Sequence, residues 1–257
     1  MRTSLPPATR RRTPSSSPLG EGPPAPHRSQ ARGGTLQGAG ARDGAGGQTA
    51  GVHEITAEAE LRELLGEPAP AALAKERDRL HELDRAWLAA SPFCLVATSG
   101  ADGSCDVSPK GDPPGFTLVL DDRTIALPER AGNRRADGYR NVLTNPHVGL
   151  LYLLPGRGDT LRVNGRARLT RDPALLDRML VRGHRPLLAL VVEVEQVFSH
   201  CAKAFLRSEL WDPGSWTPDA VPSRARIAHE LERREERLED IERYYGEQYS
   251  AGLYPAS

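Results

Sequence analysis

The chain has 257 residues, enough for one or two domains with a sizeable core, and its 34 basic residues balance 34 acidic ones. Residues 1–50 carry seven arginines but only Glu21 and Asp43, a net charge of +5, so the remaining 207 residues sum to about −5. This mildly acidic body argues against a nucleic-acid-binding surface as the main function, and three cysteines without CxxC spacing indicate neither a disulfide framework nor a zinc site.

No apolar run approaches the roughly 20 residues that span a bilayer, so we expect no membrane partner. Because the three cysteines indicate no disulfide framework, we expect a reduced, cytoplasmic setting. Residues 1–50 consist mainly of Pro, Gly, Ser, Ala and Arg with almost no large apolar side chains, and this composition predicts a disordered tail. A targeting peptide or a misassigned start codon is the alternative reading of this arginine-rich leader.

Residues 51–90 have a helical pattern. Thr56 precedes an acidic turn that begins a first helix, which Pro68 and Pro70 end. An apolar stripe then predicts a second helix from about Ala72 to Ala89. We expect these helices to form an N-terminal extension that covers one end of a sheet.

Residues 91–213 alternate short apolar runs with turn residues and predict a mainly β domain. Helices are expected from Asn133 to about Leu143, with Asn133 as the cap, and from Asp172 to Val181. About six antiparallel strands with helical insertions favour a barrel over a sandwich. The strands are expected near 93–98, 105–108, 118–120, 125–127, 147–154, 160–169 with a bulge at Gly165, and 187–198.

The stretch from Cys105 to Arg135 ends in a glycine turn, a predicted helix start and two adjacent arginines. Free amides at a helix start favour negative charge, and two guanidinium groups beside them match a phosphate. Lys110, at the end of the first strand of this stretch, is placed to reach the same anion. The alternative interpretation is a solvated basic turn with no ligand.

The C-terminal part of the chain is predicted to be helical. A helix from Ser199 to Trp211 would carry His200, Lys203 and Arg207 on one face, either as a basic site or as a solvated amphipathic face. Residues 214–257 form a predicted C-terminal extension, in which a charged helix with one short apolar seam suits docking onto a neighbouring element or subunit.

Several motifs in this order resemble a known family. The runs DVSPKGD, LPERAGNRR, LRVNGRA and HCAKAFLRSELW are similar to those of the flavin-binding split barrels of the pyridoxamine 5'-phosphate oxidase class, in particular the bacterial subgroup of FMN-dependent proteins. The resemblance covers about residues 90–213. It implies a split β-barrel of Greek-key type with peripheral helices, α+β overall, that forms a homodimer with FMN at the subunit interface.

The resemblance also implies roles for individual residues. The SPK strand would lie along the isoalloxazine ring, the strand end at residues 127–128 would flank the ribityl chain, and residues 133–135 would hold the phosphate together with Lys110. Further residues would come from the second subunit or line the substrate side. The expected cofactor-binding residues are Val107, Ser108, Pro109, Lys110, Leu127, Pro128, Asn133, Arg134, Arg135, Thr160, Arg162, Lys203, Arg207 and Trp211.

The expected function is that of an FMN-dependent oxidoreductase acting on a small-molecule substrate or electron partner, in which the flavin carries the electrons. Vitamin B6 oxidation is not expected, because Cys105 and Thr160 replace an Arg and a Gln and the C-terminal substrate motif is missing. One alternative is a reductase of the same fold that uses a deazaflavin (F420). Another is a non-catalytic flavin or haem binder, with His200 as the candidate axial ligand.

Overall fold

The structure is a computed structural model that describes residues 53–254. The chain divides into two units, residues 1–56 and 57–257, and every helix and strand given below belongs to the second unit. The disordered tail predicted for residues 1–50 lies outside the described residues. None of the helices in the described part of the chain is long and apolar enough to cross a membrane.

The core of the unit is one antiparallel sheet of seven strands. Their bounds are β1 (Phe93–Ser99), β2 (Cys105–Gly111), β3 (Leu118–Val119), β4 (Thr124–Glu129), β5 (His147–Leu153), β6 (Thr160–Thr170) and β7 (Leu188–His200). The helices described are α1 (Glu58–Leu65), α2 (Pro70–Leu73), α3 (Glu82–Ala90), α4 (Asp137–Thr144), α5 (Pro173–Asp177), α6 (Lys203–Ser208), α7 (Arg224–Leu231), α8 (Leu238–Tyr245) and α9 (Glu247–Ala251). Short 3-10 turns occupy Pro213–Ser215 and Pro218–Ala220.

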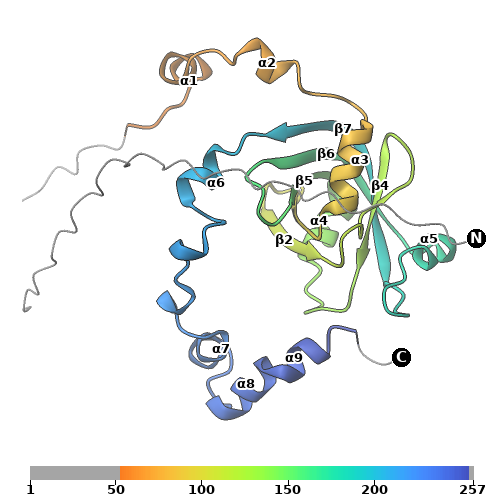
Figure 1. Cartoon of the computed structure of the whole chain (residues 1–257), viewed down its shortest axis with the longest axis vertical. Coiled ribbons are helices and arrows are strands. Elements are labelled where there is room, and N and C mark those ends of the chain that lie inside the picture. Colours follow the sequence, from red (N-terminus) through yellow and green to blue (C-terminus); the bar gives the residue numbers. More distant parts are fainter. Residues whose placement is uncertain (1–52, 255–257) are drawn as a thin grey trace, which may run out of the picture. The chain divides into compact units, whose positions relative to one another are not determined.

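The strand order in the sheet is β2-β1-β5-β6-β7-β4-β3, and the long strands β6 and β7 run side by side in Figure 1. Strands β5, β6 and β7 form a meander. Strand β4 precedes it in the chain, is joined to β5 by the long connection that contains α4, and lies beside β7, which makes a Greek key. This confirms the predicted fold class. The seven strands lie at the seven expected ranges, one more than the approximate count of six, and β3 is only two residues long.

Two ion pairs join β2 and β4, which lie in different parts of the sheet order and are not backbone partners. The Nζ of Lys110 lies 2.5 Å from Oε2 of Glu129, between the two strands themselves. Just beyond the strand ends, the Nε of Arg130 lies 2.6 Å from Oδ2 of Asp112. Side chains therefore hold the sheet in its curled form at a place where no backbone ladder does.

Two apolar clusters lie against the sheet. The larger one includes the fully buried Leu88 of α3, Tyr152 of β5 and Val163 of β6. The smaller one forms on the opposite side of β7, where Val191 packs against Leu176 of α5. Residues of β7 thus alternate between two cores, because successive side chains of a strand point to opposite faces.

The bulge predicted in the strand of residues 160–169 is present. The register between β6 and β7 shifts between Asn164 and Gly165. A Cβ atom built on Gly165 would lie 2.0 Å from the carbonyl oxygen of Glu193, so only glycine fits this close approach of two backbones.

The predicted second helix is wrong over its middle part. Residues 70–73 and 82–90 are helical, but the backbone of Arg77 forms a β-bridge with Val197 of β7. The amide of Arg77 donates to the Val197 carbonyl at 3.1 Å, and the carbonyl of Arg77 accepts from the Val197 amide at 2.8 Å. This tertiary pairing outweighs the local helical pattern, and α3 begins only at a capping box formed by His81 and Asp84.

Two other helices differ from their predicted extent. The helix expected over 172–181 covers only Pro173–Asp177, and the long C-terminal helix is split into α7 and α8. Residues Ala225, Ala228 and Ile241 are buried where these two helices pack on each other. The apolar seam is therefore used within the chain, whereas Leu231 at the end of α7 is 71% exposed.

We expect Gly165→Ala to lower the free energy of unfolding by about 1–3 kcal/mol, because the added methyl group collides with the Glu193 carbonyl. Gly132→Ala is the control, since nothing lies within 4 Å of its added Cβ and its φ is not positive, so its effect should stay below about 1 kcal/mol. Urea unfolding measures both variants. Equal effects at the two positions would show that the bulge tolerates a side chain.

Arg130→Met should cost about 3–5 kcal/mol of stability, because it leaves the carboxylate of Asp112, only 1% exposed, without its counter-charge. The guanidinium also donates to the carbonyl oxygens of Met179 and His184. Arg123→Met removes the same charge from an exposed pair with Asp78 and should cost less than about 1 kcal/mol. Thermal or urea unfolding of the two variants tests the contrast, which disappears if the Arg130 pair is no more important than a surface pair.

Candidate functional site

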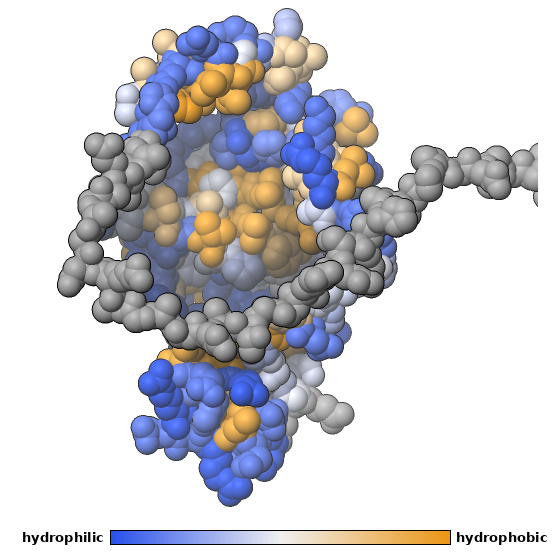
Figure 2. Space-filling view, turned by 90° about the vertical axis from the view of Figure 1, so that its left-hand side faces the viewer, coloured by the Kyte–Doolittle hydropathy of each residue, from blue (hydrophilic) through white to orange (hydrophobic). Residues whose placement is uncertain are grey.

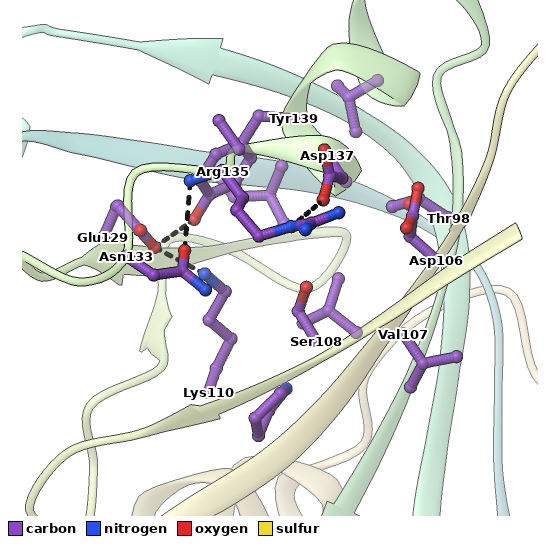
Figure 3. Close-up of a pocket in the computed structure, with 16 residues that line it drawn as sticks. Thr98, Asp106, Val107, Ser108, Lys110, Glu129, Asn133, Arg135, Asp137 and Tyr139 are labelled. Atoms are coloured by element: carbon purple, nitrogen blue, oxygen red, sulfur yellow. Dashed lines mark hydrogen bonds and ion pairs between the residues drawn. The ribbon is translucent and has the colours of Figure 1, made fainter. Parts of the chain in front are cut away.

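A cavity of about 350 Å³ lies between β2 and α4, beside the ion pair of Lys110 with Glu129 (Figure 3). Strand β2 is an edge strand that pairs only with β1 among the described residues, so its other edge is not occupied by a strand. The cavity is lined by Val96, Thr98, Asp106, Val107, Ser108, Pro109, Lys110, Glu129, Asn133, Arg135, Ala136, Asp137, Gly138, Tyr139, Val142 and Leu190.

One carboxylate oxygen accepts two hydrogen bonds at the end of the cavity near Lys110. Oε2 of Glu129 accepts from the Nζ of Lys110 at 2.5 Å and also from the hydroxyl of Tyr139. The same Nζ lies 4.7 Å from the centre of the Tyr139 ring, a cation–π distance. Figure 3 shows the three side chains converging from β2, β4 and α4.

Burial, followed by the hydrogen bond to Glu129, raises the pKa of Tyr139 well above its ordinary value. The phenol therefore keeps its proton near neutral pH and acts as a hydrogen-bond donor. Burial also raises the pKa of the Cys94 thiol to about 12, so this cysteine is a buried apolar residue and not a nucleophile.

The loop before α4 carries the predicted anion-binding residues, but the helix begins four residues later than expected. Asn133 is not its cap: its side-chain oxygen accepts from the amide of Arg135 at 3.1 Å, within the loop. Arg134 and Ala136 have φ values of 62° and 58°, a left-handed conformation that is uncommon for residues other than glycine. These two strained positions turn the chain so that α4 starts at Asp137 without a side-chain cap.

The two arginines of the loop have different surroundings. Arg135 lines the cavity, and its Nε lies 2.7 Å from Oδ2 of Asp137. Arg134 does not line the cavity, and it has no ion pair within residues 53–254. Both side chains are exposed, so either guanidinium is free to reorient toward an anion.

The end of the cavity near Asp106 and Thr98 is polar and tightly packed. Asn141 of α4 donates to Oδ2 of Asp106 at 2.8 Å and to the hydroxyl of Thr98 at 3.1 Å. A Cβ atom on Gly138 would lie 3.2 Å from that hydroxyl oxygen, so the glycine allows α4 to approach the sheet. These contacts fix the helix start against β1 and β2.

The structure brings together part of the predicted site. Six expected residues line the cavity: Val107, Ser108, Pro109, Lys110, Asn133 and Arg135. The others do not line it: Leu127, Pro128, Arg134, Thr160, Arg162, Lys203, Arg207 and Trp211. Among the latter, Leu127 and Thr160 are buried at 2% and 3% exposure in this single chain.

Arg162 belongs to a separate polar cluster on β6 and β7. Its guanidinium stacks over the ring of Phe198 at 4.2 Å and donates to Gln196 at 3.2 Å, while its buried Nε has no hydrogen-bond partner among residues 53–254. His200 lies beside the same ring at 5.0 Å. Burial and the charges of Arg162 and Lys75 lower the pKa of His200, so this imidazole is neutral near pH 7.

The predicted helix face of His200, Lys203 and Arg207 is wrong. His200 is the last residue of β7, where it pairs with Thr160 of β6, and α6 begins only at Lys203. Backbone pairing with β6 therefore extends the strand over residues that were expected to be helical. Only Lys203 and Arg207 share a helical turn.

Sequence reasoning missed Glu129, Tyr139, Asp106 and Thr98 as members of the site. Glu129 directly follows the expected strand end at residues 127–128. An acidic residue so close to a predicted cluster of basic residues could have been recognised from the sequence as a candidate ion-pair partner. The contribution of Tyr139 depends on how α4 packs on the sheet, which the sequence does not show.

The antiparallel sheet has a Greek-key connection, a side-chain contact between β2 and β4, and a cleft between β2 and α4; together these define a split β-barrel. Residues 80–201 match the model of the family described as pyridoxamine 5'-phosphate oxidase. The similarity to that family lies in these residues, where the motifs predicted it.

Comparison with solved structures gives similar folds at low identity. HupZ of Group A Streptococcus is 18% identical, with 47% of this chain and 93% of that chain covered and a TM-score of 0.39. An FMN-binding protein of Syntrophomonas wolfei is 14% identical, with 56% and 96% covered and a TM-score of 0.35. An F420 reductase is 20% identical, with 44% and 93% covered and a TM-score of 0.31. Comparison with curated proteins gives no match.

Proposed function

We propose that this protein is an FMN-dependent oxidoreductase of the pyridoxamine 5'-phosphate oxidase class, with residues 91–213 as the cofactor-binding barrel and residues 51–90 and 214–257 as helical extensions. The observation that carries the proposal is the cavity beside the free edge of β2, at which Lys110, Asn133 and Arg135 meet. It occurs within the segment that matches the family.

The residues present suit a flavin mononucleotide. The uncapped start of α4 and the side chains of Asn133 and Arg135 offer donors to a phosphate, and Arg134 is near in sequence with a free guanidinium. The backbone of Val107 and Ser108 on the edge strand offers hydrogen-bonding groups to a planar ring. FMN supplies the electron transfer, while the chain binds it, orients it and shapes the polarity around its ring.

No residue of the cavity needs to act as a nucleophile in this proposal. The hydroxyl of Tyr139 keeps its proton and donates a hydrogen bond to the carboxylate of Glu129. The side-chain amide of Asn141 donates to Asp106 and Thr98. These groups position the cavity wall rather than react. The substrate would approach the ring from the side that β2 leaves open.

A homodimer completes the proposed site. The outer face of the sheet has a shallow hollow whose lining includes Ala97, Val107 and Gly149, and Val107 is 62% exposed. Figure 2 shows apolar residues gathered in a hollow on one face of the protein. We propose that a second copy covers the outer face and brings residues such as Arg162 and Trp211 toward the flavin, since neither lines the cavity of its own chain.

The deciding experiment for the cofactor is the visible spectrum of protein purified without added flavin, followed by mass analysis of any released chromophore. We expect a yellow protein that releases FMN. Arg135→Ala should weaken FMN binding about tenfold, the effect of losing one charge-assisted hydrogen bond to the phosphate, and should change riboflavin binding less. Arg140→Ala removes the same charge from an exposed position of α4 outside the cavity and serves as control.

Colourless protein that also rejects added FMN would contradict the proposal. Binding of a deazaflavin in its place would keep the fold and change the cofactor. If Arg135→Ala and Arg140→Ala had equal effects, the phosphate would lie elsewhere.

The proposed dimer is tested by light scattering on the purified protein, which should report twice the chain mass of 27.9 kDa. Ala97→Arg places a charge in the hollow of the outer face and should shift the protein to monomers and weaken FMN binding. Leu83→Arg is the control, because Leu83 of α3 is already 73% exposed. A wild-type monomer that binds FMN fully would rule out the shared site.

A further inference from the structure

The cavity contains more acid than base. Its charged lining consists of three carboxylates and two cations, so the wall carries one net negative charge. A phosphate monoester at pH 7 adds about 1.5–2 further negative charges. The three carboxylates are Asp106, Glu129 and Asp137, and the two cations are Lys110 and Arg135.

The most buried cation of this lining is already neutralised. Lys110 and Glu129 are 19% and 23% exposed, so their attraction is screened much less than that of a surface pair. By contrast, Arg135 is 73% exposed and is free to leave Asp137 when an anion approaches. Lys110 contacts an incoming phosphate only if that phosphate competes with the carboxylate of Glu129.

Asp106 has a different role in the same wall. It accepts a hydrogen bond from Asn141 and makes no ion pair within the described residues. Two of the three carboxylates thus differ in their partners, since Glu129 binds Lys110 and Asp106 does not. This difference separates competition for Lys110 from the general effect of a negative wall.

We propose that Glu129 is an internal competitor for the phosphate of the ligand: it occupies Lys110 in the free protein, and a phosphate-bearing ligand must displace it. Glu129 then sets how strongly the cavity distinguishes a phosphorylated ligand from its unphosphorylated form. This inference rests on the proposed flavin site for the identity of the ligand, but the competition for Lys110 concerns any phosphate.

The test compares the affinities for FMN and for riboflavin, which lacks the phosphate, in full-length wild type, Glu129→Gln and Asp106→Asn. We expect Glu129→Gln to raise the affinity ratio of FMN to riboflavin about tenfold and Asp106→Asn to raise it less than about threefold. In a Lys110→Met background, Glu129→Gln should have little further effect, because the competed cation is gone. Circular dichroism of each variant checks that it is folded.

The opposite results overturn the inference. If Glu129→Gln lowers FMN and riboflavin binding together, Glu129 only supports the structure of the cavity. If it lowers the ratio, Glu129 positions Lys110 for the phosphate instead of competing with it. Equal effects of Glu129→Gln and Asp106→Asn on the affinity ratio would show that both carboxylates act only through the net charge of the cavity wall.

Inorganic phosphate separates this inference from the proposed function. Its binding is measured by calorimetry on the same proteins, and we expect Glu129→Gln to bind it about tenfold more tightly than wild type does. If no flavin binds but phosphate shows this gain, the flavin proposal fails and the competition stands. If FMN binds but neither ligand responds to Glu129→Gln, the competition fails and the flavin proposal stands.

Discussion

The curled sheet depends on two ion pairs that cross from β2 to β4. The backbone ladder runs from β2 through β1, β5, β6 and β7 to β4, and nothing in it requires the first and the sixth strand to meet. Lys110 with Glu129 and Asp112 with Arg130 make that connection at 2.5 and 2.6 Å. Since the side chain of Asp112 is almost fully buried, its ion pair is structural. The partly exposed ion pair of Lys110 with Glu129 borders the cavity.

This arrangement explains why a cavity suited to an anion contains so many carboxylates. A lysine pointing into a partly buried cleft is costly unless a counter-charge accompanies it. Glu129 supplies that charge, and the hydroxyl of Tyr139 donates a second hydrogen bond to the same carboxylate oxygen. In the competition we propose, the carboxylate that stabilises Lys110 also weakens the binding of a phosphate to it.

The sequence predicts those features that depend on local pattern. Alternation of apolar residues located the long strands, and the glycine break in the strand of residues 160–169 located the bulge at Gly165. Predictions of features that depend on residues distant in the sequence were wrong, or the features were not predicted. Arg77 leaves a helical pattern to pair with Val197, and His200 stays in a strand because Thr160 lies opposite. The pairing of Glu129 with Lys110 likewise could not be predicted, because the sequence does not show that side chains of β2 and β4 meet.

The free edge of β2 is the feature that connects this fold to binding. An exposed edge with unpaired backbone groups invites another strand, and proteins usually protect such edges. Pro109 lies in the middle of β2 and has no amide hydrogen to donate, and α4 covers part of the strand, with Gly138 lying against Thr98 and Ser108. These two features make a further strand unfavourable there but leave backbone groups of the neighbouring residues accessible from the cavity. In the flavin site we propose, a flat, hydrogen-bonding ring would use this edge without extending the sheet.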